Sequence, residues 1–153
     1  MPDKFFVDSN VLVYRRDTGA GDKQARADAW LRLLWQDGTG RISVQVIEEY
    51  YTTVTRKLTP GLTPREAIEE ARDFFVWQPL ALTPDLLESA WQCEQRYRLS
   101  FWDSLITAAA QASGCRYLLT EDLQDGQRLG DLTVIDPFQH EPGTPPHDES
   151  GTS

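Results

Sequence analysis

Short apolar runs alternate with longer amphipathic segments along the first 138 residues. The apolar runs that predict strands are 4–7, 41–43, 79–82, 115–119 and 132–135, and the segments with apolar residues at helical spacing are 22–36, 44–58, 64–77, 84–98 and 101–113. Alternating strands and helices predict a parallel sheet with helices on both of its faces. The expected fold class is therefore α/β.

Capping residues mark two of the predicted helix starts. Thr63 is an expected N-cap, Pro64 is the first helical residue, and Glu66 completes a capping box. Ser100 is the expected cap of the last helix, and Gly114 ends it. Because this helix is nearly all apolar or small, we expect it to be deeply buried against the sheet.

Residues 139–153 differ in composition from the rest of the chain. They are rich in Pro, Gly and polar residues and hold almost nothing apolar. Such a segment cannot bury enough surface to offset the entropy lost on ordering. We predict one domain over residues 1–138, followed by a disordered polar tail at 139–153.

The size of the chain fits a single domain. It has 153 residues, of which 40% are hydrophobic. No stretch approaches the ~18–20 apolar residues of a membrane span, and the N-terminus lacks the basic and apolar regions of a secretory signal. We expect a cytoplasmic protein without a membrane segment, in which Cys93 and Cys115 are ordinary buried thiols.

The net charge of −9 limits the ways in which this chain can bind nucleic acid. Broad electrostatic binding needs many Lys and Arg residues to neutralise phosphates, so the acidic balance argues against it. It does not exclude an enzyme that acts on nucleic acid, because bound metal ions reverse the sign of an acidic site locally.

Two acidic residues stand at the ends of predicted strands. Asp8 closes the first apolar run, and Asp122 closes the run that contains Leu119. Ligands of parallel α/β sheets bind beyond the carboxyl ends of the strands, so both acids are expected at that edge. A turn or N-cap role also explains Asp8, and Glu121 and Asp125 compete with Asp122 for its place.

Two further acids lie on predicted helices. Glu49 falls at the edge of the apolar stripe of 44–58, whereas Glu48 lies nearer the polar side. Asp103 is in the first turn of 101–113, where the helix dipole alone favours an acid by ~0.3–1 kcal/mol. Clustered carboxylates with no base or nucleophile beside them bind hard divalent cations, which then most often act on phosphate esters. Without metal, the carboxylates should repel and raise one another's pKa values.

The four segments that carry these acids resemble the PIN domain. They are 6–12, 43–51, 99–106 and 118–126, in this order and at these spacings. The resemblance covers about residues 3–138 and points to the VapC-type toxins of bacterial toxin–antitoxin pairs. It implies a three-layer α/β/α PIN-like sandwich with a central parallel sheet.

The resemblance also implies an activity, a divalent-metal-dependent endoribonuclease that hydrolyses RNA phosphodiesters through a metal-activated water. The implied catalytic and metal-binding residues are Asp8, Glu49, Asp103 and Asp122, supported by Asn10 and Thr120. The implied ion is Mg²⁺, for which Mn²⁺ can substitute. The implied partners are an RNA substrate, a small antitoxin protein and a second copy of the chain in a homodimer.

Basic and aromatic residues near the acidic motifs are candidates for contacts with RNA. The basic candidates are Arg15, Arg16, Arg56 and Lys57, and ordinary solvated charge explains them equally well. Tyr51 and Trp102 are candidates for base stacking, although core packing is the stronger expectation for Trp102.

Two alternatives to a ribonuclease stay open. A haloacid-dehalogenase-like phosphatase also places a nucleophilic Asp after its first strand, but its general acid two residues on would here be Asn10, and no suitable downstream Lys is evident. A catalytically inactive PIN module that only binds a partner is the second alternative. The full set of four acids argues against it.

Overall fold

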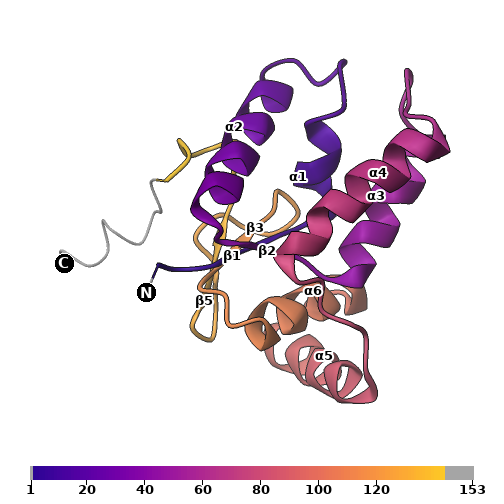
Figure 1. The fold of residues 1–153 in the computed structure, drawn as a ribbon. Coiled ribbons are helices and arrows are strands. Elements are labelled where there is room, and N and C mark those ends of the chain that lie inside the picture. Colours follow the sequence, from indigo (N-terminus) through magenta and orange to yellow (C-terminus); the bar gives the residue numbers. More distant parts are fainter. Residues whose placement is uncertain (1, 144–153) are drawn as a thin grey trace.

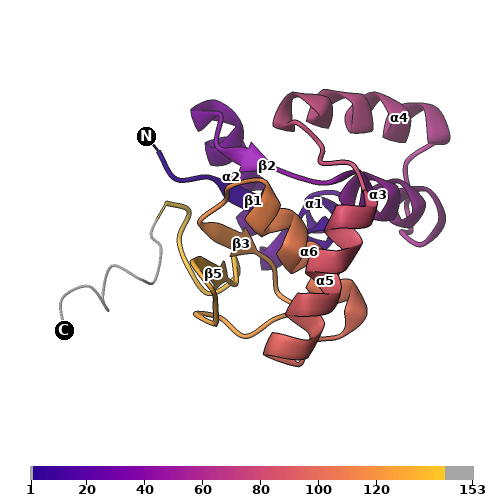
Figure 2. The same cartoon turned by 90° about the horizontal axis from the view of Figure 1, so that it is seen from below.

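A five-stranded sheet lies between helices in the computed structural model, which describes residues 2–143 (Figures 1 and 2). The strands are β1 (Phe5–Val7), β2 (Gly40–Arg41), β3 (Tyr117–Leu119), β4 (Arg128–Leu129) and β5 (Leu132–Ile135), arranged in the order β2-β1-β3-β5-β4. Every pairing is parallel except that of β4 with β5. The predicted central parallel sheet is confirmed, with one short antiparallel strand added at its edge.

Helices cover both faces of this sheet. They are α1 (Ser9–Tyr14), α2 (Asp22–Asp37), α3 (Val44–Arg56), α4 (Pro64–Asp73), α5 (Pro84–Tyr97) and α6 (Phe101–Ala112). The α1 and α2 helices lie on one face and α5 and α6 on the other, while α3 and α4 extend the molecule to the side (Figures 1 and 2). The three-layer α/β/α arrangement is confirmed.

Besides the added strand β4, the structure differs from the predicted elements in three places. The α1 helix was not predicted, because six residues are too few to show a helical period. The predicted helix 64–77 ends at Asp73 and continues only as a 3₁₀ turn, η1 (Phe74–Trp77). The predicted strand 79–82 is wrong, since only Leu80 makes a bridge, to Ser43, which lies two residues past β2.

The predicted caps form as expected. Thr63 Oγ1 accepts a hydrogen bond from the Glu66 N–H at 3.2 Å, and the Glu66 carboxylate accepts one from the Thr63 N–H at 2.9 Å. Ser100 caps α6 by accepting from the Asp103 N–H at 3.1 Å. All seven residues from 104 to 110 of α6 are buried, which confirms the deep burial expected of this helix.

The polypeptide beyond β5 packs back onto α2. The fully buried Trp30 donates its Nε1–H to the carbonyl oxygens of Pro137 and His140, at 3.0 and 3.1 Å. Arg26 donates to the same His140 oxygen at 2.6 Å. These contacts tie the first residues of the predicted tail to the domain, and residues 144–153 of that tail lie outside the described residues.

The two cysteines are buried free thiols, as expected. Burial raises the pKa of Cys115 to about 12, so this thiol stays protonated at neutral pH. Among residues 2–143, none of the helices combines the length and the apolar composition needed to cross a membrane.

Candidate active site

Asp8 lies where β1 ends and α1 begins, and it is only 6% exposed. Its backbone N–H donates to the Leu119 carbonyl at 3.0 Å, which carries the β1–β3 pairing one residue past the strands. Its carboxylate accepts from the Ser9 N–H at 2.7 Å, as an N-cap of α1. The capping role and the strand-end role weighed in the sequence are therefore both present in one residue.

The end of β3 supplies the next two members of the site. The fully buried Thr120 donates its hydroxyl to Asp8 Oδ2 at 2.9 Å and accepts from the Asp122 N–H at 3.1 Å. The Asn10 amide donates to Asp8, Thr120 and Asp122, at 3.4, 3.1 and 3.1 Å. One side-chain amide thus joins the two strand-end carboxylates, as the parallel pairing of β1 with β3 predicts.

Glu49 approaches from α3 through Ser9. The Ser9 hydroxyl donates to one Glu49 oxygen at 3.0 Å, and the Gln45 amide donates to the other at 3.4 Å. The neighbouring Glu48 is exposed and receives no hydrogen bond within the described part of the chain. The structure therefore places Glu49, rather than Glu48, next to α1. The linking role of Ser9 was not predicted, although it lies beside Asp8 in the sequence.

Asp103 reaches the site from the opposite layer. It is half-buried in the first turn of α6, and its charge contributes to raising the pKa of Asp122. Trp102, which precedes it, is 64% exposed. The expectation that Trp102 packs in the core is therefore wrong, because at the N-terminus of α6 it points away from the buried face that residues 104–110 form.

Burial dominates the electrostatics of the site. The pKa of Asp8 is raised to about 7, chiefly by burial. The hydrogen bonds from Thr120 and the Ser9 N–H lower it, and the charges of Asp122 and Glu49 contribute smaller increases. Burial also raises the pKa of Asp122, followed by the charge of Asp103. The predicted mutual repulsion is present, since the charges of neighbouring acids raise both pKa values, but desolvation is the larger cause.

The two acids that competed with Asp122 have other partners. Glu121 accepts from the Tyr14 hydroxyl at 2.5 Å and pairs with Lys23 at 2.8 Å. Asp125 contacts His140 Nε2 at 2.7 Å and accepts from the Asp136 N–H at 2.9 Å. Asp122 alone of the three shares a hydrogen-bond donor with Asp8.

The carboxylate and amide oxygens of this site are ligands that suit a hard divalent cation, but the side chains are widely spaced. Asp8 forms no ion pair among residues 2–143, and the buried Asn10 Oδ1 beside it has no hydrogen-bond partner. Within that same range, no three Asp, Glu, His or Cys side chains lie close enough to enclose a metal ion. Mg²⁺ needs only one or two carboxylates because it retains water, and Asp8 with Asp122 meets that requirement.

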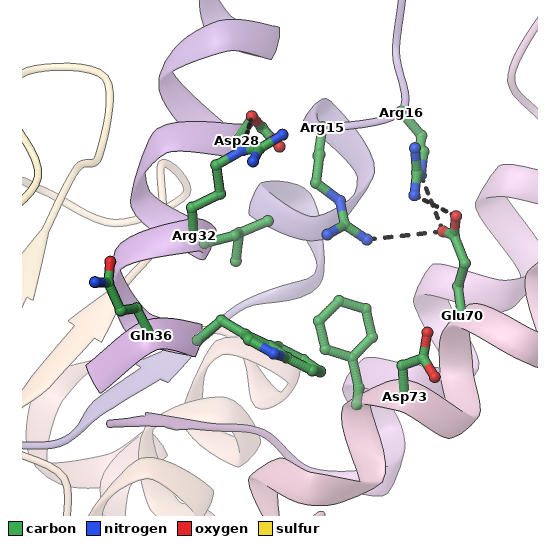
Figure 3. A pocket seen from close by; sticks show the side chains of 10 residues that line it. Arg15, Arg16, Asp28, Arg32, Gln36, Glu70 and Asp73 are labelled. Atoms are coloured by element: carbon green, nitrogen blue, oxygen red, sulfur yellow. Dashed lines mark hydrogen bonds and ion pairs between the residues drawn. The ribbon is translucent and has the colours of Figure 1, made fainter. Parts of the chain in front are cut away.

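The basic residues named as RNA contacts have different surroundings. Arg15 and Arg16, at the end of α1, both point toward Glu70 on α4 at the rim of a cavity of about 640 Å³ (Figure 3). Arg16 pairs with Glu70 closely, whereas Arg15 lies 3.7 Å from it and stacks on Phe74. By contrast, Arg56 and Lys57 at the end of α3 are exposed and form no ion pair within the described residues.

The class of this protein is defined by an α/β/α sandwich in which the buried Asp8 and the exposed Asp122 lie at the carboxyl edge of the parallel strands. A model of the PIN domain family matches residues 5–127. The chain belongs to the PIN domain family, which confirms the resemblance found in the sequence. The phosphatase alternative fails with this assignment, and Asn10 is a hydrogen-bond donor to Asp8 rather than a general acid beside it.

Solved structures share this fold at low sequence identity. VapC20 of Mycobacterium tuberculosis, a toxin that cleaves the sarcin–ricin loop, is 20% identical, with 78% of this chain and 90% of that chain covered and a TM-score of 0.57. A toxin–antitoxin complex from Klebsiella pneumoniae is 18% identical, with 90% and 99% covered and a TM-score of 0.63. VapBC2 of Rickettsia felis, bound to promoter DNA, is 16% identical, with 85% and 96% covered and a TM-score of 0.57. No curated protein sequence matches the chain.

Proposed function

We propose that this protein is a divalent-metal-dependent endoribonuclease that acts in the cytoplasm as the toxin of a toxin–antitoxin pair. The observation that carries the proposal is the buried Asp8 carboxylate, which lies at the carboxyl edge of the sheet without a cationic partner among residues 2–143. A buried carboxylate without an opposing charge costs several kcal/mol. A metal ion would remove that cost and create a reactive centre in the same place.

The ion would be Mg²⁺, with Mn²⁺ as a substitute. Asp8 and Asp122 would hold it directly, and Glu49 and Asp103 would act partly through water. When bound, such an ion lowers the pKa of a coordinated water and neutralises charge on the leaving 3′ oxygen of a phosphodiester.

The residues of the chain itself fix the position and the protonation of these carboxylates. The Ser9 N–H and the Thr120 hydroxyl orient Asp8, and the Asn10 amide holds Asp122 beside it. Because the pKa of Asp8 without metal is about 7, the ion has to compete with a proton near neutral pH. Metal binding should therefore strengthen as the pH rises through 7.

The substrate and partners follow from the family. One structural neighbour bears the name of a toxin that cleaves the sarcin–ricin loop, and others were solved as complexes with antitoxins. RNA as substrate and a small antitoxin as partner are the corresponding proposals here. A homodimer is proposed as well, and the exposed Trp91 and Trp102 supply apolar surface for an interface.

Cleavage assays with a matched variant test the proposed function. Purified protein is incubated with total bacterial RNA in Mg²⁺, in Mn²⁺ and in EDTA, and cleavage is followed at single-nucleotide resolution. We expect discrete cuts with either metal and none in EDTA. Asp8→Asn should lower the rate by about a thousandfold or more, since it removes several kcal/mol of metal-dependent stabilisation. The exposed Asp3→Asn serves as the control.

Wild-type cleavage by Asp8→Asn would overturn this mechanism. Intact RNA in every condition, together with a stable folded protein, would favour the module that only binds a partner.

A further inference from the structure

A hollow of about 400 Å³ lies beside Glu49 on the surface of α3. Its lining residues are Ser9, Glu48, Glu49, Thr52, Thr53 and Lys57. Ser9 and Glu49 are hydrogen-bonded to each other at 3.0 Å and belong to the carboxylate site. The hollow is therefore a continuation of that site along α3.

The lining side chains form a row along one face of the helix. Glu49, Thr53 and Lys57 are four residues apart, so they lie on the same side in successive turns. Lys57 is the C-cap of α3 and keeps helical dihedrals, with its N–H donating to the Thr53 carbonyl. Eight residues of helix separate Lys57 from Glu49 by about 12 Å. A strand bound along the row would put at Lys57 a phosphate other than the one at the carboxylates.

The chemistry of the row changes along its length. Lys57 is exposed, and its ammonium group forms no ion pair within residues 2–143. Thr52 and Thr53 add hydroxyl groups that can donate to phosphate or ribose oxygens. Glu48 at the rim is the opposing element, because its charge repels a phosphate backbone.

We propose that this hollow binds the RNA backbone next to the cut, with Lys57 contacting a phosphate that flanks the scissile one. The inference rests on the proposed ribonuclease function and specifies where the substrate strand runs. It separates Lys57 from the other basic candidates, since Arg15 and Arg16 lie beside Glu70 and Arg56 does not line the hollow. Lys57 and the threonines act as positioning residues for this strand.

Binding measurements test the path of the strand without requiring cleavage. Fluorescence anisotropy is recorded with two labelled oligouridylates, a long one and a dinucleotide, on protein carrying Asp8→Asn, over a series of KCl concentrations at fixed Mg²⁺. Adding Lys57→Gln should weaken binding of the long RNA by about two- to fivefold, the range of a single exposed ion pair. The slope of log K against log salt should flatten by about 0.7, as for the loss of one phosphate contact to a single strand.

Three further variants make the test specific. Glu48→Gln should strengthen binding of the long RNA, because it removes a repelling charge, and Lys57→Arg should keep the wild-type salt slope. Arg56→Gln is the matched control, with the same loss of charge one residue away from the hollow. The dinucleotide has a single phosphodiester and cannot occupy both the carboxylate site and Lys57, so it should bind all variants equally.

The inference is overturned if Lys57→Gln and Arg56→Gln have equal effects, or if the dinucleotide loses as much affinity as the long RNA. Failure of the proposed function gives a different result. In that case wild-type protein cuts no RNA, whatever the binding series shows.

Discussion

An acidic side chain lies near each end of α1, and the two differ in whether a cationic side chain neutralises them. At the start of α1, the carboxylate of Asp8 is buried and, among the described residues, accepts hydrogen bonds from the neutral groups of Ser9, Asn10 and Thr120. At the end of α1, the carboxylate of Glu70 on α4 faces Arg16 and Arg15 (Figure 3). It also accepts a hydrogen bond from the Tyr50 hydroxyl. Within residues 2–143, Asp8 has no cationic partner, whereas the charge of Glu70 is neutralised by its arginine neighbours.

This contrast separates structural acids from candidate catalytic ones. Glu121 with Lys23 and Asp125 with His140 follow the pattern of Glu70, in which a partner within the chain satisfies the charge. Asp8 and Asp122 follow the other pattern, and burial raises the pKa of both. Acids that a fold leaves without a cation are the ones available to a metal.

Replacement of Asp8 by Asn should give the largest change in stability, and it should be stabilising in the absence of metal. Because the folded-state pKa of about 7 exceeds the ordinary 3.8, the folded protein holds the proton more tightly. The contribution of Asp8 to stability is therefore full below the ordinary pKa and is lost as the pH rises through 7. At pH 8, Asp8→Asn should raise the free energy of unfolding by at most about 4 kcal/mol, and the gain should vanish near pH 4.

Urea unfolding in EDTA at several pH values measures this effect. Asp3→Asn, which changes an exposed acid, should show no gain that depends on pH in this way. If Asp8→Asn lowers the free energy of unfolding at pH 8 as much as at pH 4, then Asp8 is not a buried ionised carboxylate at pH 8.

Replacement of Asp122 should have the next largest effect and sharpen the division between the two kinds of acid. Asp122→Asn should lower RNA cleavage by about 10–100-fold, because it removes one of the two carboxylates joined by Asn10. Asp125→Asn should leave the cleavage rate within about threefold, since Asp125 contacts His140 instead. Single-turnover rates at saturating Mg²⁺ decide between them, and equal rates for the two variants would assign Asp125 to the site.

Replacement of Glu70 should give the smallest effect, opposite in sign to that of Asp8. Glu70→Gln leaves Arg16 and Tyr50 with a weaker acceptor, so it should lower the free energy of unfolding by about 1–2 kcal/mol. RNA cleavage should stay within about twofold. Arg32→Gln, which breaks the exposed pair with Asp28 at the same cavity, is the control and should change stability by less than about 0.5 kcal/mol. A stabilised Glu70→Gln protein would remove the distinction between the two ends of α1.

The longer elements could be predicted because apolar residues recur in them at regular spacing and because recognisable capping residues mark their ends. The Thr63 capping box and the buried face of α6 are both legible as residue types at fixed spacing. The α1 helix and the β4 strand were missed, because six and two residues show no period. Leu80 was misread since an apolar run beside a sheet edge looks the same whether or not it pairs along its length.

Only the site residues that lie at strand ends could be placed from the sequence. Asp8 and Asp122 meet because their strands are neighbours in a parallel sheet, which the alternation of elements implies. Glu121 pairs with Lys23, which lies 98 residues away in the sequence. Asp125 contacts His140, which lies 15 residues away. Local pattern carries no information about such contacts, so the sequence could not choose between these acids and Asp122.

Both edges of the sheet present few backbone groups with which a strand of another molecule could pair. The edge strands β2 and β4 have two residues each and include Arg41 and Arg128. Beyond β2 the backbone of Leu80 bonds to Ile42 and Val44, and a side chain added at Gly40 would collide with the Trp77 ring at 2.5 Å. Short, charged and covered edges resist the strand-to-strand pairing that starts aggregation. The sheet of this protein therefore disfavours association of separate molecules through strand pairing at its edges.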